Sequence, residues 1–168
     1  VFPEQGIRRS WAELDTEADA LAAGLLNLGL KTGDRVGIWS PNRYEWLLTQ
    51  IATARVGLIL VTINPAYRLA EVEYVLNQVE CACLVTAAAF KTSNYVAMIQ
   101  ELAPELASAK PGALNSSVLP HLRSVVCMGN ETISGMLNFG DVVQSGRKNK
   151  TIDLDAISES LSPDDAIN

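Results

Sequence analysis

The stretch RVGIWSPNRYEWLLTQIATARVGLILVTI, residues 35–63, predicts a strand, a helix and a second strand in succession. Arg35–Trp39 is a short apolar run, which is typical of a strand buried on both faces. The apolar residues that follow recur at helical spacing, with Asn42 as the expected N-cap and Gly57 as the expected end of the helix. Leu58–Ile63 is again a strand-like run. A strand, a crossover helix and a second strand form a right-handed unit with parallel strands.

The same alternation continues on both sides of this unit. On the N-terminal side, Ser10 and Glu13 have the spacing of a capping box, and they predict the start of a helix that ends before Gly29. On the C-terminal side, the turn Asn64–Tyr67 precedes a helix, a strand and a further helix, over residues 69–79, 81–86 and 95–102. Alternating elements with short connections define an α/β fold, with mainly parallel strands in a sheet covered by helices on both faces.

The alternation weakens after Pro104. Residues 104–122 hold prolines, a glycine and serines, and we expect an irregular excursion of the chain there. A strand is predicted over residues 124–128 and a short helix over 139–144, whereas the polar, acidic segment 148–168 predicts no regular element.

Length and charge restrict the possible functions. A chain of 168 residues with 48% hydrophobic residues is long enough to form one hydrophobic core and too short for two domains of ordinary size. Its 13 basic against 19 acidic residues give a net charge of −6, which argues against a nucleic-acid or anionic-membrane partner. The longest apolar stretch, Val56–Val61, is far too short to be a transmembrane segment. The chain starts at Val1, and no apolar signal-peptide core follows. We therefore expect Val1 to be a truncated end, with a further segment of the protein before it.

The three cysteines predict a location but no metal site. Cys81, Cys83 and Cys127 are an odd number in a chain that needs no disulfides, which predicts a reducing compartment and a cytoplasmic protein. The single residue between Cys81 and Cys83 is not the spacing of a zinc knuckle. His121 is the only histidine of the chain. We therefore expect buried thiols and no metal ligands.

The motifs of common active sites are absent or incomplete. Neither the glycine pattern of dinucleotide folds nor the serine elbow of hydrolases occurs. Residues 24–32 resemble a Walker loop, but they have one residue too many before Lys31 and follow a helix instead of opening one. We expect the paired acids to be solvated and the aromatic residues to lie in the core or its rim. The acids are Glu71 and Glu73, Asp153 and Asp155, and Asp164 and Asp165; the aromatics are Trp11, Trp39, Tyr44, Trp46, Tyr67 and Tyr74.

An ordered set of short motifs resembles one protein family. The order and spacing of the motifs are similar to those of the acyl-CoA synthetases of the adenylate-forming superfamily. The set comprises Ser10-Trp11-Ala12-Glu13-Leu14, Ala18–Leu28, Lys31–Ile38, Ser40-Pro41-Asn42, Ala54–Gly57 and Asn64–Tyr67. Three segments look closest to the medium-chain branch known as acyl-CoA synthetase family member 2, namely Asn64–Tyr67, Glu71–Leu76 and Pro111–Leu114.

The resemblance implies an enzyme whose chemistry lies elsewhere in a longer protein. In the family, a carboxylate attacks the α-phosphate of ATP to give an acyl-adenylate and pyrophosphate, and the thiol of coenzyme A then displaces AMP. The implied substrate is a fatty acid, and the implied cofactors of the parent enzyme are ATP, Mg²⁺ and coenzyme A. The family's phosphate loop follows a segment like Ser162–Asn168.

The resemblance therefore implies that residues 1–168 are the N-terminal portion of the AMP-binding domain, an incomplete part of that large domain. The phosphate loop and the C-terminal domain would be absent, and this portion alone would bind no cofactor and be inactive. We carry over no residue as catalytic, cofactor-binding or metal-binding.

Two other interpretations remain open. A self-contained α/β binding or interaction module without catalysis would show the same alternation, and it would need a closed sheet and a true C-terminus near Asn168. A flavodoxin-like enzyme or receiver domain would need an acidic phosphoacceptor at a strand end or a flavin phosphate loop. The residues at the strand ends are instead Ser40, Asn64 and Ala87. An incomplete sheet would expose an apolar edge or face, which predicts homo-oligomers or marginal stability.

Overall fold

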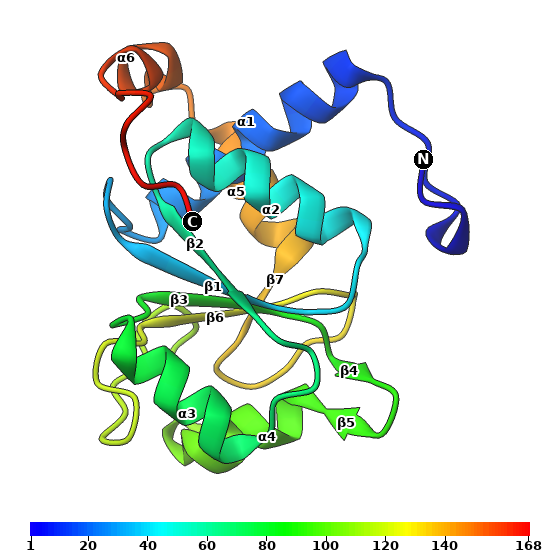
Figure 1. The fold of residues 1–168 in the computed structure, drawn as a ribbon, viewed down its shortest axis with the longest axis vertical. Helices are drawn as coiled ribbons and strands as arrows, with labels where there is room; N and C mark the ends of the chain where they lie inside the picture. Colours follow the sequence, from blue (N-terminus) through cyan, green and yellow to red (C-terminus); the bar gives the residue numbers. More distant parts are fainter.

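Five strands of the computed structural model, which describes residues 1–168, form one parallel sheet (Figure 1). They follow one another in space as β2-β1-β3-β6-β7, and every neighbouring pair is parallel. This arrangement confirms the predicted α/β class. The strands are β1 (Arg35–Trp39), β2 (Ile59–Ile63), β3 (Cys83–Thr86), β6 (Ser124–Cys127) and β7 (Leu137–Asn138).

Helices cover both faces of this sheet, as the sequence predicts. On one face lie α1 (Trp11–Asn27), α2 (Tyr44–Arg55) and α5 (Phe139–Lys148), and on the other lie α3 (Leu69–Gln78) and α4 (Tyr95–Leu102) (Figure 1). None of the helices combines the length and the hydropathy needed to cross a membrane. The smaller elements are η1 (Pro3–Gln5), the hairpin of β4 (Ala89–Phe90) and β5 (Ser93–Asn94), η2 (Pro104–Ala107) and α6 (Leu154–Glu159).

β1 lies at the centre of the hydrophobic core because both of its faces are covered. Val36, Ile38 and Trp39 are completely buried. Gly37 passes beneath the thiol of Cys81, and a Cβ added to this glycine would lie only 3.1 Å from the sulfur. The Gly37 N–H donates a hydrogen bond to the same sulfur over 3.3 Å. A side chain at this position would fit only if the Cys81 sulfur and the neighbouring apolar side chains shifted by a few tenths of an ångström.

Both predicted ends of α1 are confirmed. Ser10 Oγ accepts a hydrogen bond from the Glu13 N–H, and the Glu13 carboxylate accepts one from the Ser10 N–H over 2.7 Å. At the other end, Gly29 adopts a φ of 86°, which glycine reaches without strain. Between these ends the helix buries an apolar stripe that includes Leu21 and Leu25.

α1 and α5 approach each other until their backbones touch. A Cβ on Gly24 of α1 would overlap the Val142 carbonyl of α5, and a Cβ on Gly146 of α5 would overlap the Ala20 carbonyl of α1. No side chain fits at either glycine while the helices remain in place. Where the two helices end, Asn149 Nδ2 donates a hydrogen bond to Asn27 Oδ1 over 2.6 Å.

The N-terminal cap of α2 differs from the prediction. Asn42 is not the cap residue; Arg43 occupies that position, and its side chain makes no capping hydrogen bond. Instead, Gln5 Oε1 accepts a hydrogen bond from the Tyr44 N–H over 2.7 Å, and Gln5 Nε2 donates one to Glu45 over 2.9 Å. The capping group thus comes from 39 positions earlier in the chain, where local spacing cannot reveal it.

Two elements near the C-terminus have no counterpart in the sequence predictions. β7 contains only two residues and is defined by its pairing with Val126 and Cys127 of β6. α6 begins where Asp153 accepts a hydrogen bond from the Ala156 N–H. Only Leu154 and Ile157 of its six residues pack against the core, and two half-buried residues are too few to predict a helix. The predicted helix at residues 139–144 is present but extends to Lys148.

The segment between η2 and β6 contains no helix or strand. It is nevertheless anchored, because Leu114, Leu119 and Leu122 are buried in the core. Ser116 Oγ accepts hydrogen bonds from the N–H groups of Val118 and Leu119, which forms a turn between the first two leucines. The buried leucines therefore hold an irregular backbone against the sheet.

We expect Gly146→Ala to lower the free energy of unfolding by about 1–3 kcal/mol, because the new Cβ forces α1 and α5 apart. The matched control is Gly140→Ala in the same helix, where the nearest atom to the new Cβ is Asn138 Oδ1 at 3.2 Å. Both variants gain helix propensity of about 1 kcal/mol. Urea unfolding followed by circular dichroism measures both, and equal stabilities would contradict the backbone contact.

We expect Gln5→Ala to cost about 1 kcal/mol of stability, because it leaves the first turn of α2 without its capping acceptor. Asn42→Ala should change stability by less than about 0.5 kcal/mol, since Asn42 is exposed and caps nothing. The two variants are compared by their urea midpoints. A larger loss for Asn42→Ala would show that Asn42 is the cap in solution.

Candidate functional site

The carboxyl ends of β1 and β3 form the topological switch point of the sheet. From β1 the chain crosses to β2 through α2 on one face, and from β3 it crosses to β6 past α4 on the other (Figure 1). In open parallel sheets, ligands bind in the crevice outside the strand ends at such a point. This edge is therefore the first candidate position for a ligand-binding site.

The crevice itself is filled by a network that ties the strand ends together. The Trp39 and Tyr95 rings stack with their centroids 4.0 Å apart. Trp39 Nε1 donates to Asn64 O over 3.2 Å, and the Tyr95 hydroxyl donates to Pro65 O over 2.7 Å. Thr86 Oγ1 donates to Trp39 O over 3.2 Å. The side-chain donors of these residues are already used, so the network stabilises the fold and leaves no reactive group.

A cavity of about 570 Å³ opens beside the crevice, between the N-terminal segment and the loop after β1. Its cation, Arg43, donates two hydrogen bonds of 2.8 Å to Glu45. Burial raises the pKa of Glu45, but hydrogen bonds from Arg43 and Gln5 outweigh it and hold the pKa below its usual value. Arg43 is therefore already neutralised. The other lining residues are Val1, Phe2, Pro3, Glu4, Gln5, Pro41, Asn42 and Phe90.

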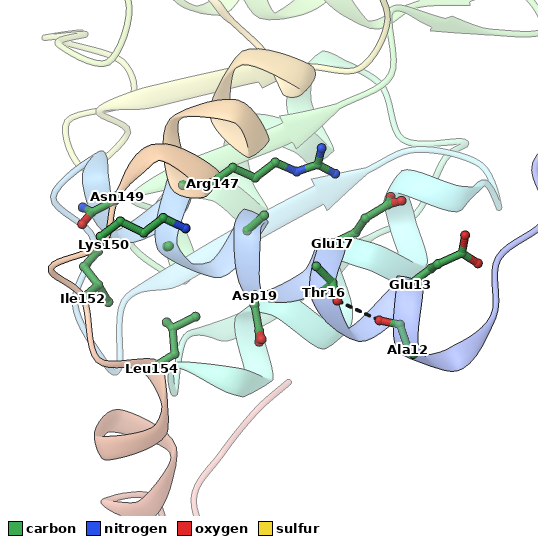
Figure 2. Close-up of a pocket in the computed structure, with 13 residues that line it drawn as sticks. Ala12, Glu13, Thr16, Glu17, Asp19, Arg147, Asn149, Lys150, Ile152 and Leu154 are labelled. Atoms are coloured by element: carbon green, nitrogen blue, oxygen red, sulfur yellow. Dashed lines mark hydrogen bonds between the residues drawn. The ribbon is translucent and has the colours of Figure 1, made fainter.

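A groove of about 680 Å³ lies between α1, the end of α5 and residues 149–154 (Figure 2). Its acids, Glu13, Glu17 and Asp19, all come from α1. Each already has a partner beside the groove: the Ser10 N–H for Glu13, Arg9 for Glu17, and Arg55, whose Nε lies 3.0 Å from Asp19 Oδ1. Desolvation by burial raises the pKa of Asp19, and the nearby Arg55 only partly offsets this.

The cations of this groove are free. Arg147 and Lys150 extend from the end of α5 along it (Figure 2), and neither forms an ion pair. Arg147 lies in the last turn of α5, and Lys150 lies two residues after the helix ends. The helix dipole favours cations near a helix C-terminus, which explains both residues without a ligand. Neither cavity brings a nucleophile next to a base.

The three cysteines are buried and unpaired. The Cys81 thiol donates to Cys83 O over 3.1 Å, and burial raises its pKa to about 12. Burial also raises the pKa of Cys83 and of Cys127. Protonated, enclosed thiols are neither nucleophiles nor metal ligands, and these residues fill the core.

The other candidates from the sequence lie apart from one another. His121 is exposed, and no group of three His, Cys, Asp or Glu side chains is arranged to hold a metal ion. Glu71 accepts a hydrogen bond from the Arg68 N–H at the start of α3, and Asp153 caps α6. Gly24 lies inside α1 against Val142, so it cannot open a phosphate loop.

The aromatic residues fit their prediction in part. Trp39 and Tyr44 are buried, and Trp46 and Tyr67 are half-buried at the rim. Trp11 and Tyr74 are 83% and 66% exposed, so for these two the prediction is wrong. Each occupies the solvent side of an amphipathic helix, where spacing alone does not separate rim from surface.

The fold of the chain is that of a solved N-terminal domain. The crystal structure of the N-terminal domain of FACL13 from Mycobacterium tuberculosis superposes with a TM-score of 0.71 at 19% identity. The match covers 98% of this chain and 35% of that structure. At this identity the likeness shows the fold alone.

The sequence then identifies the family. Residues 1–146 match the family described as AMP-binding enzyme, and the chain belongs to it. The chain is 43% identical over 168 residues to a zebrafish (Danio rerio) protein named medium-chain acyl-CoA ligase ACSF2, mitochondrial, covering 100% of this chain and 28% of that protein. It is 42% identical over 169 residues to the human protein of the same name, covering 100% of this chain and 27% of that protein. The expected resemblance is thereby confirmed, and the chain spans little more than a quarter of these relatives.

The predicted cytoplasmic location is wrong. The zebrafish, mouse and human relatives are all named as mitochondrial proteins. The prediction used the unpaired cysteines, and unpaired buried thiols show only that no disulfide forms. They do not distinguish one reducing compartment from another.

We expect the cysteines of the folded chain to resist thiol reagents. At pH 8, a thiol whose pKa is about 12 is ionised to about one part in ten thousand, and raising the pH increases that fraction. Ellman's reagent should therefore label no cysteine rapidly in the native chain and three per chain in denaturant. Rapid labelling of Cys81 in the native chain would contradict its burial.

Proposed function

We propose that the chain is the N-terminal portion of a medium-chain acyl-CoA ligase, an enzyme that joins a fatty acid to coenzyme A with cleavage of ATP. The observation that carries the proposal is the 43% identity to a medium-chain acyl-CoA ligase along all 168 residues. Because the chain spans 28% of that relative, the activity belongs to the longer protein.

Residues 1–168 would form the first part of the AMP-binding domain, with the phosphate loop and the C-terminal domain outside the chain. One match supports this division: the chain aligns with a structure of an N-terminal domain but covers only 35% of it.

The residues of this chain do not fit ATP or Mg²⁺. A triphosphate needs a cradle of backbone N–H groups or free cations, and Mg²⁺ prefers oxygen ligands. Gly24 is covered by Val142, so it offers no backbone cradle. The free cations Arg147 and Lys150 share their groove with three carboxylates of α1, which would repel a triphosphate. No cluster of acidic side chains is arranged around a common point to hold Mg²⁺. ATP, Mg²⁺ and coenzyme A would therefore be held by residues elsewhere in the parent protein, and we assign no step of the reaction to this chain.

What the chain would contribute is a rigid frame. The doubly covered sheet and the Trp39–Tyr95 stack fix the loops at the carboxyl edge, where the 570 Å³ cavity opens. A preorganised frame of this kind holds binding groups supplied by other parts of a domain. The alternative, a self-contained binding module, gains no support from the cavities, and the identity to ligases along the whole chain argues against it.

The test compares the 168-residue chain with the complete parent protein in an assay for acyl-CoA formation from ATP, Mg²⁺, coenzyme A and fatty acids of increasing length. We expect the parent to form acyl-CoA and AMP, with highest kcat/KM for medium-chain acids. The 168-residue chain should form neither product.

Two results of this assay would contradict different parts of the proposal. Acyl-CoA formation by the 168-residue chain would overturn its proposed inactivity and the proposal that ATP and Mg²⁺ are held elsewhere. A folded parent that forms no acyl-CoA from any acid would overturn the ligase assignment. A heat-inactivated parent and a reaction without ATP serve as controls.

A further inference from the structure

β2 is the strand at one end of the sheet, and it pairs with β1 alone. Its Ile59 N–H donates to Asp34 O on the β1 side over 3.0 Å. Because successive residues of a strand direct their backbone groups to opposite sides, Leu60 and Thr62 direct theirs away from β1. The outer edge of β2 therefore presents the N–H and C=O groups of these two residues.

Only one of these four groups has a partner within the chain. The Leu60 N–H donates to Ile167 O over 2.9 Å, and the C-terminus lies beside β2 in Figure 1. The Leu60 carbonyl and the N–H and carbonyl of Thr62 make no hydrogen bond. A strand edge with free backbone groups is a template for another strand, and residues 58–63, LILVTI, contain neither a charge nor a proline that would prevent pairing.

The bond between Leu60 and Ile167 has the pattern that opens a parallel strand pair. Bonded residues of an antiparallel pair exchange two hydrogen bonds, whereas the Ile167 N–H donates none to Leu60 O. In the parallel pair of β1 and β2, Ile59 donates to Asp34, the residue directly before the one that it faces. By the same rule Leu60, which donates to Ile167, faces Asn168. The C-terminal residues therefore enter the edge in the direction of β2.

We propose that the outer edge of β2 is completed by the parent protein's own continuation, as a parallel strand that starts at Asn168. In this register the first residue after Asn168 donates to Leu60 O and accepts from the Thr62 N–H, and the third residue donates to Thr62 O. Every outward backbone group of Leu60 and Thr62 is then satisfied, and the five-stranded sheet gains a sixth strand.

The continuation is favoured over a second copy or a separate segment for two reasons. Ile167 is already bonded to the edge, and any other strand must displace it in order to pair with Leu60. The residues directly after Asn168 are tethered to that bond, so their effective concentration at the edge is on the order of 1 mM. A second copy competes only at comparable protein concentrations.

The inference rests on the proposed function in one respect, namely that residues 1–168 continue into a longer protein, since they cover 28% of the zebrafish relative. It uses no catalytic property. The two proposals therefore fail separately: a parent that forms no acyl-CoA leaves the pairing of β2 untouched, and an active ligase with an open β2 edge contradicts the pairing alone.

Amide hydrogen exchange of the parent protein and of the 168-residue chain tests the proposal. In the 168-residue chain the Thr62 N–H has no partner and should exchange fast. In the parent it should exchange at least about tenfold more slowly, at every protein concentration, because its partner belongs to the same molecule. Mass spectrometry of the peptide that spans β2 measures both rates.

Two proline substitutions in the parent identify the segment that covers the edge. Proline in place of the first residue after Asn168 removes the N–H that bonds to Leu60 O, so the strand should detach and Thr62 should lose its protection. Proline in place of the second residue is the matched control, because the N–H of that residue points away from β2. The control should leave Thr62 protected. Circular dichroism confirms that both variants retain their fold.

Three outcomes would overturn the proposal. One is a Thr62 N–H that exchanges equally fast in the parent and in the 168-residue chain. The second is protection that appears only as the protein concentration rises, which would assign the edge to a second copy. The third is equal protection of Thr62 in both proline variants, since another segment would then cover β2.

Discussion

The backbone contact between α1 and α5 is the constraint on which the rest of the structure depends. It needs Gly24 and Gly146 at the same crossing, since a side chain on either would push the helices apart. The contact fixes α5 on the same face of the sheet as α1 and α2. It also determines where the chain leaves α5. That point in turn determines the position of the groove in Figure 2, the position of α6 and the path of the C-terminal residues towards β2.

The parts of the fold that follow from local sequence were predictable, and those that depend on distant partners were not. The capping box at Ser10 and the apolar run of β1 are local signals, and the structure contains both. β7 has two residues and is a strand only because β6 lies next to it. Gln5 caps α2 from outside any local pattern. α6 has six residues and packs only Leu154 and Ile157 against the core, so it is too short to show a periodic pattern.

The candidate sites show the same limit. No motif in the sequence indicates the cavity beside the switch point, because its lining comes from the N-terminal segment, the loop after β1 and Phe90. Predicting that cavity requires knowing to which side of the sheet each connection between strands runs, and only the assembled sheet shows this. The family resemblance, in contrast, depends on short motifs in a fixed order, and it was readable from the sequence and is supported along the whole chain. The motifs that identify this family are thus largely those that cap helices and turn the chain, not those that perform chemistry.

The hydrogen bond between Asn27 and Asn149 joins residues 122 positions apart, and the neighbouring α1–α5 contact spans a similar length of chain. A ribosome adds about 5–20 residues per second, so α1 emerges roughly 6–24 s before the helix that covers it. During that interval the alanine and glycine face of α1 has no partner, although β1, β2 and β3 are already available to assemble. The nascent chain therefore passes through a stage in which one face of its sheet is only partly covered, and this is the stage at which a chaperone would find it.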